Sequence, residues 1–102
     1  MRRVYRIVYT ATARSDLLAI GDTIREAAGP RIAERFIERV ITTADSLSDM
    51  PERHRLGAEL ADGFRAISVG KYLIFYVVDD ETVSIIRVLH GARDITAKLL
   101  GA

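Results

Sequence analysis

The chain has no cysteine among its 102 residues. It therefore has no disulfide framework and no thiolate metal site, and its composition does not imply secretion. Its two isolated histidines, His54 and His90, are too few to form a metal site. We expect no metal or other cofactor.

Long apolar runs are missing as well. No stretch is long enough to span a bilayer. Met1, Arg2 and Arg3 have no apolar run behind them, which argues against a signal peptide. We therefore expect a cytoplasmic protein with no membrane partner.

An excess of charge of one sign is also missing. Lys and Arg number 15 and Asp and Glu number 14, which gives a net charge of +1. This balance differs from the broad basic excess of a general nucleic-acid binder. The sequence also has no Gly-rich phosphate loop and no Ser-His-Asp spacing. Several arginines and Lys71 nevertheless lie on or beside predicted strands, so a sheet with basic edges could meet an anionic surface.

The clearest feature that the chain does have is an apolar stretch near its end. Residues 72–78 and 82–89 are rich in β-branched and aromatic side chains, and Asp79, Asp80 and Glu81 separate them. This pattern predicts two strands joined by a tight turn. The hairpin is apolar at nearly every position, so we expect most of both its faces to be covered.

Helical periodicity precedes this hairpin. Apolar residues recur at helical spacing over 12–28, with Thr12 or Ser15 as the expected N-cap, and again over 31–48. Gly29 separates the two helices, and Pro30 suits the first position of the second. Residues 4–9 and 63–69 read as strands. Residues 49–62 read as a long loop, and long loops are often functional.

These elements predict a single α+β domain over residues 1–102. The order is β-α-α-β-β-β, with a helical hairpin packed on one face of a small, mainly antiparallel sheet. The expected core residues are Leu17, Ile24, Phe36, Val40, Leu47, Phe75 and Ile85.

A cationic cluster follows the last strand and is the first candidate site. Arg87, His90 and Arg93 could hold an anion, or could form a nuclease centre with His90 moving protons. Alternatively, Arg87 pairs with an acid, His90 caps the strand end, and Arg93 pairs with Asp94 or a helix. A third reading is contact with a partner.

Other candidates are more scattered. Arg65 could face the same groove as Arg87, or could be an edge charge that blocks unwanted strand pairing. Arg53 and Arg55 flank His54 in the long loop, which is either solvated or a partner contact. Tyr72 and Tyr76 share one face of a strand and read as core residues rather than base-stacking platforms. The charges of the second helix, at 31, 34, 35, 38 and 39, read as a solvated face or as a groove for a partner.

The chain resembles the RelE/ParE family of bacterial type II toxins, and the ParE branch most of all. The matching positions are spread over the whole chain. They are Tyr9 with Ala13-Arg14-Ser15-Asp16-Leu17, Ala33 with Phe36, Leu47 and Pro51, Gly63-Phe64-Arg65, Tyr72-Leu73-Ile74-Phe75-Tyr76, and Arg87-Val88-Leu89-His90-Gly91-Ala92-Arg93-Asp94.

The resemblance implies the fold predicted above and a small, ParD-like antitoxin that wraps the toxin with a helix and an extended segment. It also implies a target: DNA gyrase for the ParE branch, or mRNA on the ribosome for the RelE branch. RelE-like nucleases tend to carry several sheet cations and a Tyr after the last strand. Here no Tyr follows Tyr76, and Lys71 is the only lysine before Lys98.

We therefore interpret the chain as a gyrase inhibitor that acts by binding, not by catalysis, in a toxin–antitoxin hetero-oligomer. The alternatives are an mRNA endonuclease, for which His90, Arg87 and Arg65 are the catalytic candidates, and a toxin fold that has lost toxicity and only binds its antitoxin. The expected partner-binding residues are Arg65, Arg87, His90, Arg93, Arg53 and Arg55. We expect an antitoxin helix over the helical hairpin or the open sheet face, and an extended antitoxin segment along a sheet edge.

Overall fold

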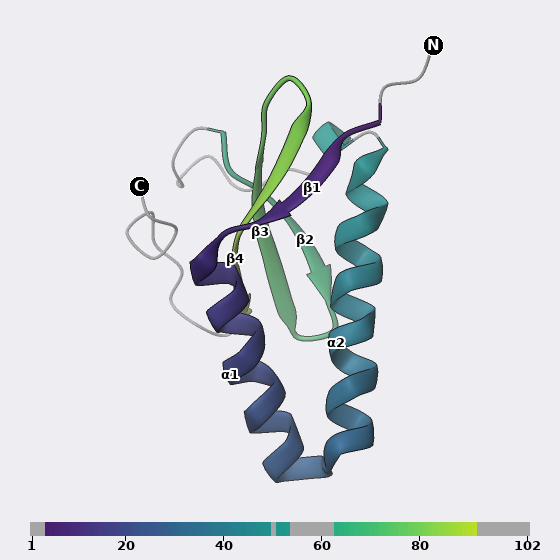
Figure 1. Cartoon of the computed structure of the whole chain (residues 1–102), viewed down its shortest axis with the longest axis vertical. Coiled ribbons are helices and arrows are strands. Elements are labelled where there is room, and N and C mark those ends of the chain that lie inside the picture. The colour runs from purple at the N-terminus through teal and green to yellow at the C-terminus, as the bar shows by residue number, and fades with distance from the viewer. Residues whose placement is uncertain (1–3, 50, 54–62, 92–102) are drawn as a thin grey trace.

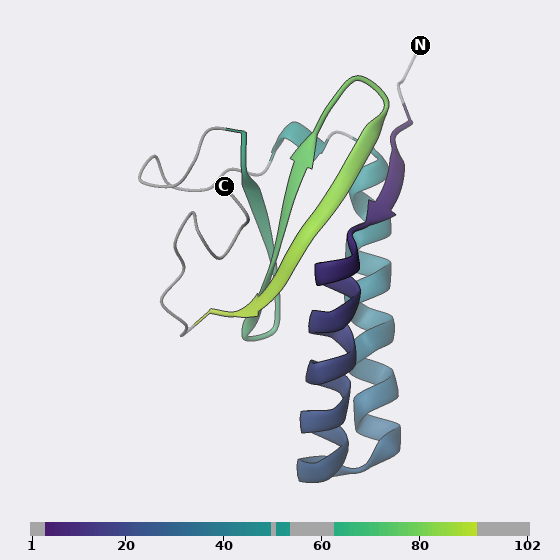
Figure 2. The same cartoon turned by 60° about the vertical axis from the view of Figure 1, so that its left-hand side comes forward.

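The protein is a helical hairpin packed on one face of a four-stranded sheet (Figures 1 and 2). The computed structural model describes residues 4–49, 51–53 and 63–91. In chain order the elements are β1 (Arg6–Tyr9), α1 (Ala11–Ala28), α2 (Pro30–Asp45), the 3₁₀ turns η1 (Ser46–Ser48) and η2 (Pro51–Arg53), β2 (Arg65–Val69), β3 (Tyr72–Val78) and β4 (Thr82–His90). The predicted order β-α-α-β-β-β is confirmed. Within the described part of the chain, neither helix is long and apolar enough to cross a membrane.

The sheet is mixed, with strand order β1-β4-β3-β2. β2, β3 and β4 form an antiparallel meander, as expected. β1 pairs parallel to β4, with Arg6 opposite Thr82 and Tyr9 opposite Ile85. β1 therefore joins the far end of the chain at one edge of the sheet, and the "mainly antiparallel" prediction holds for two of the three pairings.

A single residue, Thr10, separates β1 from the first helix. The helix begins at Ala11, one residue earlier than expected. The N-cap is Thr10, so the prediction of Thr12 or Ser15 is wrong. Thr10 has extended backbone, and its Oγ1 accepts a hydrogen bond from Ala13 N at 3.1 Å. The same hydroxyl donates to the carbonyl oxygen of Ile86 at 3.1 Å, and the Thr10 N–H donates to the Ile85 carbonyl. Contact with β4 thus decides which residue caps the helix.

The remaining boundaries shift slightly. The second helix ends at Asp45 and continues as η1, whereas the sequence predicted helix to residue 48. The first strand begins at Arg6 rather than residue 4, and β2 begins at Arg65 rather than residue 63. Gly29, with φ of 94°, makes the tight link between the helices.

A β-bulge interrupts the β3–β4 ladder. Tyr76 pairs with Ile85 and Phe75 pairs with Arg87, so Ile86 is the extra residue on β4. A bulge bends its strand and redirects the side chains beside it. Here it lies where β1 ends and α1 begins, next to Arg87.

The core has two parts, one on each face of the sheet. The larger part lies between helices and sheet and includes Val40, Ala44, Leu47, Ile74, Tyr76, Val83, Ile85 and Val88. The smaller part is Phe75 and Leu89, with Phe64, Ala66 and Leu73 packed against them. Because Phe75 alternates with Ile74 and Tyr76 along β3, this smaller cluster lies on the opposite face. The expectation that both faces are covered is confirmed at Phe75 and Leu89.

Four of the seven expected core residues are buried: Val40, Leu47, Phe75 and Ile85. Leu17, Ile24 and Phe36 are only partly buried, so the prediction is wrong for these three. The helical hairpin extends past the end of the sheet (Figure 1), and its outer turns therefore have less to pack against. Helical periodicity identifies the apolar face of a helix but not how deeply each residue is covered.

The difference in burial predicts unequal costs of aromatic truncation. Phe75→Ala should lower the free energy of unfolding by about 3–5 kcal/mol, the cost of removing an aromatic ring from a packed core. Phe36→Ala should cost clearly less, because Phe36 is half-buried and its site opens to solvent. Chemical denaturation of both variants measures the difference, and equal losses would contradict it.

Tyr9 generates a second stability prediction. Its hydroxyl is buried without a hydrogen-bond partner among the described residues. Burial, followed by the charge of Asp45, raises the pKa of Tyr9. Tyr9→Phe should therefore stabilise the fold by about 1 kcal/mol, because an unpaired buried polar group is removed.

The pH dependence of the Tyr9→Phe effect gives a separate check. A raised folded-state pKa means that the stability linked to the Tyr9 proton is fully present below the unfolded value of 10.0 and is lost as pH rises through the folded value. The stability advantage of Tyr9→Phe should therefore grow above pH 10. Denaturation of both proteins at neutral and alkaline pH tests this, and an unchanged difference would contradict it.

Candidate functional site

Arg87, from the first candidate site in the sequence, forms a bidentate ion pair with Asp16. Its Nε donates to Asp16 Oδ2 at 2.7 Å, and its Nη2 donates to Asp16 Oδ1 at 2.9 Å. The side chains are 16% and 13% exposed, respectively, so the pair is largely shielded from water. The hydrogen bonding of Arg87 to Asp16 raises the pKa of Arg87, against the smaller opposing effect of burial. The reading in which Arg87 pairs with an acid is confirmed.

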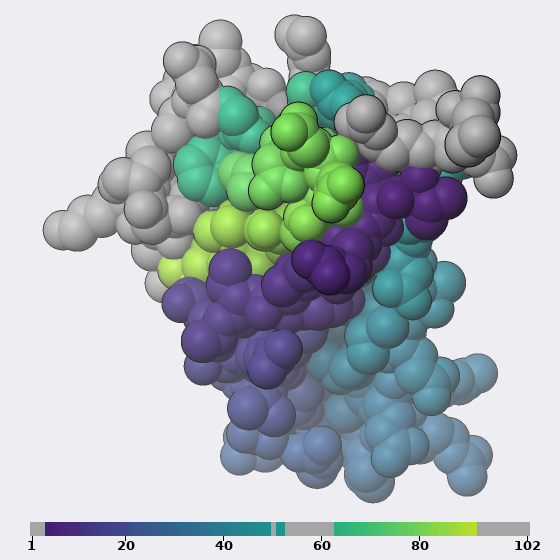
Figure 3. All heavy atoms as spheres, turned by 45° about the horizontal axis from the view of Figure 1, so that its top comes forward, coloured from purple at the N-terminus to yellow at the C-terminus, as the bar shows by residue number. Residues whose placement is uncertain are grey.

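Asp16 also completes the backbone pairing of the sheet. β1 pairs with β4 only as far as Ile85, so the rest of this edge of β4 lies beside α1. Asp16 Oδ2 accepts the Val88 N–H at 3.0 Å on that edge. In the space-filling view, the start of α1 lies directly against the β3–β4 hairpin (Figure 3). One carboxylate thus ties the first helix both to a side chain and to the backbone of the last strand.

Arg65 contacts a different element. Its Nη1 donates to the Glu52 carbonyl oxygen at 2.9 Å, and its Nη2 lies 3.9 Å from Glu52 Oε2. Arg65 is on β2 and Arg87 is on β4, with β3 between them. The two arginines therefore contact different elements, η2 for Arg65 and α1 for Arg87.

His90 is exposed at the end of β4 and stacks on an aromatic neighbour. Its ring meets Tyr72 edge-on, with centroids 5.1 Å apart, and Tyr72 in turn meets Phe36 of α2 at 5.2 Å. Tyr76 is fully buried, and its hydroxyl donates to the Pro51 carbonyl oxygen. Tyr72 and Tyr76 thus pack between sheet and helices, as the sequence indicated.

Three further candidates cannot be placed. Arg55 and Arg93, with their neighbours His54 and Asp94, lie outside the described residues. The side chain of Arg53 also lies outside them, although its backbone belongs to η2. Within the described part, no three His, Asp or Glu residues gather where they could hold a metal ion.

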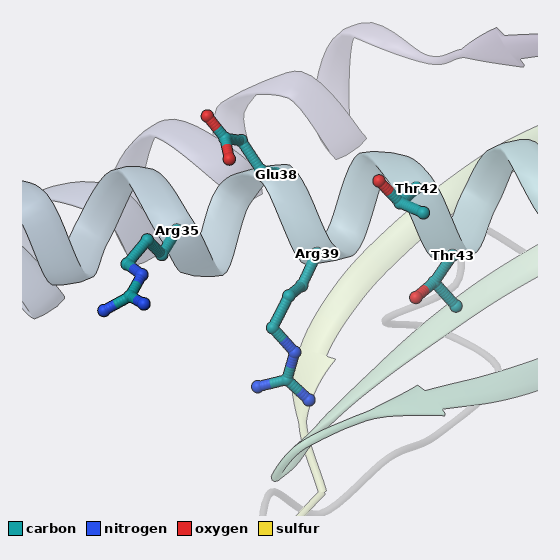
Figure 4. Close-up of a pocket in the computed structure, with 5 residues that line it drawn as sticks. All are labelled: Arg35, Glu38, Arg39, Thr42 and Thr43. Carbon is teal, nitrogen blue, oxygen red and sulfur yellow. The ribbon is translucent and has the colours of Figure 1, made fainter.

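The structure adds two hollows on the helical hairpin. A groove of about 610 Å³ runs between α1 and α2; its lining includes Leu17, Leu18, Ile37, Glu34 and Glu38. A second hollow of about 420 Å³ lies on the other side of α2 and is lined by Arg35, Glu38, Arg39, Thr42 and Thr43 (Figure 4). The sequence offered these helix charges only as a solvated face or a partner groove, and it did not identify Asp16 as the acid that holds Arg87.

Comparison with known proteins identifies the class to which this fold belongs. A family model described as "ParE toxin of type II toxin-antitoxin system, parDE" matches residues 7–95. The chain is 41% identical over 88 residues to Toxin RelE2 of Caulobacter vibrioides, covering 86% of this chain and 97% of the relative. It is 28% identical over 94 residues to Toxin ParE3 of the same organism, covering 92% and 94%. The chain is thus a toxin of the type II toxin–antitoxin class.

Solved structures agree with this assignment. A structure described as the chromosomal ParDE toxin–antitoxin system from P. aeruginosa superposes with a TM-score of 0.76 at 18% identity, covering 85% of this chain and 96% of that chain. The toxin–antitoxin complex RelBE2 from Mycobacterium tuberculosis gives 0.59 at 35% identity, covering 89% and 95%. The chain belongs to the RelE/ParE family.

The ion pair at Asp16 predicts a large effect from a small change. Asp16→Asn keeps an oxygen that can accept the Val88 N–H but removes the charge that Arg87 needs. An uncompensated charge in a shielded site should lower the free energy of unfolding by about 3 kcal/mol.

Asp22→Asn is the matched control for Asp16→Asn. Asp22 pairs with Arg25 at 2.8 Å at the rim of the groove between α1 and α2, where the Asp22 side chain is 73% exposed and that of Arg25 is 52% exposed. Its loss should cost no more than about 0.5 kcal/mol, as for other exposed helix pairs. Denaturation of both variants measures the difference, and similar small losses for both would show that the Asp16–Arg87 pair does not stabilise the fold.

Proposed function

We propose that this toxin inhibits DNA gyrase by binding to it, without catalysis of its own, and that a cognate antitoxin neutralises it in the cytoplasm. The observation that carries the proposal is the Arg87–Asp16 pair. A nuclease needs cations that are free to stabilise charge on a phosphate. Arg87 and Arg65, two of the three catalytic candidates, are engaged by Asp16 and Glu52 instead. The ParE family match over residues 7–95 supports the same target.

The antitoxin is proposed because the similar solved structures are described as toxin–antitoxin systems or complexes. The groove between α1 and α2 has the shape and chemistry for an amphipathic helix: Leu17, Leu18 and Ile37 supply apolar surface, and Leu18 is 73% exposed. The outer edge of β2 carries no paired strand among the described residues, so an extended antitoxin segment could add to the sheet there.

A second candidate function is cleavage of mRNA on the ribosome. The observation in its favour is the 41% identity to a relative named Toxin RelE2. His90 is the group that such a mechanism would use, because it is exposed at the end of β4 and its imidazole is of a type that serves as a general acid or base.

His90→Ala separates the two functions. If the toxin acts by binding gyrase, the variant should retain most of its toxicity. Expression of the wild type should then induce the DNA-damage response while translation initially continues, and the purified toxin should inhibit supercoiling by gyrase. Arg6→Gln is a matched control, because Arg6 is an exposed residue on β1, away from the β4 terminus.

The opposite result would favour the nuclease. It would consist of mRNA cut at codons, an immediate stop in translation, unimpaired gyrase, and loss of toxicity in His90→Ala with an unchanged fold. Neither activity in the wild-type protein would indicate a toxin fold that only binds its antitoxin.

A further inference from the structure

The charges of α2 are sorted into two rows. Arg31, Arg35 and Arg39 recur every four residues and therefore lie along one side of the helix, about 6 Å apart along its axis. Glu34 and Glu38 line the groove toward α1, and Glu38 also borders the hollow that Arg35 and Arg39 line. Figure 4 shows Arg35 and Arg39 pointing from the same side of α2, while Glu38 points from the other. We call Arg31, Arg35 and Arg39 the arginine row.

One member of the arginine row, Arg39, reaches the turn between β2 and β3. A Cβ placed on Gly70 in this turn would lie 3.9 Å from Arg39 Nη1, so the guanidinium reaches the turn backbone. Arg39 also lies over the Phe36 ring, 5.9 Å from its centroid, which helps to hold it in place. Lys71 follows Gly70 and is exposed. Arg35 and Arg39 thus line the hollow, and Lys71 adds an exposed cation in the turn that Arg39 reaches.

These cations are not neutralised within the described protein. Arg31, Arg35 and Arg39 form no ion pair with any residue in the described ranges, unlike Arg25, Arg65 and Arg87. Thr42 and Thr43 add two hydroxyl groups to the hollow. Guanidinium groups beside hydroxyl groups are suited to oxyanions, and the planar fork of arginine matches a carboxylate in particular.

The spacing indicates the kind of anion. In an extended peptide, alternate side chains point the same way and lie about 6.6 Å apart. This is close to the spacing of about 6 Å along the arginine row. We propose that the arginine row, with Lys71, binds an acidic peptide in extended conformation that carries carboxylates on alternate residues.

A nucleic-acid duplex fits less well. Its phosphates would spread across the surface of α2, where Glu34 and Glu38 repel them, whereas a single peptide chain can follow the arginine row alone. The net charge of +1 also gives the whole protein little attraction for a polyanion. The inference deepens the antitoxin part of the proposed function, because a peptide of this kind is what the antitoxin would supply. It does not depend on the target of the toxin.

The experiment measures binding of the full chain to a fluorescent synthetic peptide of alternating Glu and Ser. The free protein should bind the peptide, and binding should weaken as salt is raised. The double variant Arg35→Glu, Arg39→Glu should weaken binding about tenfold or more, because two attractions become repulsions. Arg6→Glu, the control on exposed β1, should change the affinity less than about twofold. Equal effects of the row and control variants would overturn the proposal.

Two further measurements guard against misfolding and against a different ligand. Arg35→Glu alone should weaken binding without changing the thermal midpoint, whereas Arg39→Glu also loses its contact with Phe36. Arg39→Lys should restore part of the affinity, since it keeps the charge but loses the fork. A DNA duplex that binds more tightly than the peptide, and loses its affinity in the same variants, would assign the arginine row to nucleic acid instead. Because the peptide assay involves neither gyrase nor ribosomes, its failure is distinguishable from failure of the proposed function.

Discussion

The carboxylate of Asp16 joins the first helix to the last strand. It accepts two hydrogen bonds from the Arg87 guanidinium and one from the Val88 backbone, and so satisfies a side chain and an open strand edge together. Buried charges are tolerated only when they are paired and hydrogen-bonded in this way. The position of α1 against the sheet follows from this contact, and so does the position of the groove between α1 and α2.

The bulge in β4 prepares this contact. It places Ile86 out of the ladder, and the Ile86 carbonyl oxygen accepts the hydroxyl of Thr10 at the start of α1. The helix start, the end of β1 and the irregular point of β4 therefore meet at one place. Beside this place, the Asp16–Arg87 ion pair holds β4 against α1. Because Arg87 is engaged by Asp16, the exposed cations of the described protein lie elsewhere, and Arg31, Arg35 and Arg39 are those on α2.

Much of the fold could be predicted because its signals are local. Helical spacing, the Gly29-Pro30 junction and the acidic turn before Thr82 predict the element order and place each boundary within about three residues of its observed position. The parallel pairing of β1 with β4 and the true N-cap, Thr10, could not be predicted, because both depend on backbone contacts between residues about 75 positions apart. The candidate site was likewise predictable only as far as local signals reach. The sequence pointed to Arg87 and to an acidic partner for it, but nothing local distinguished Asp16 from the other acids.

The pairing of β1 with the distant strand β4 affects the order in which the fold forms during synthesis. Among the described residues, β1 pairs only with β4, about 75 positions further along the chain. Contacts between such distant segments form late, because a long loop must close first. While the ribosome is still making the carboxyl-terminal hairpin, the two helices have no sheet on which to bury their apolar faces. The toxin surface is therefore assembled only after β4 has been synthesised, and a nascent or truncated chain without β4 lacks it.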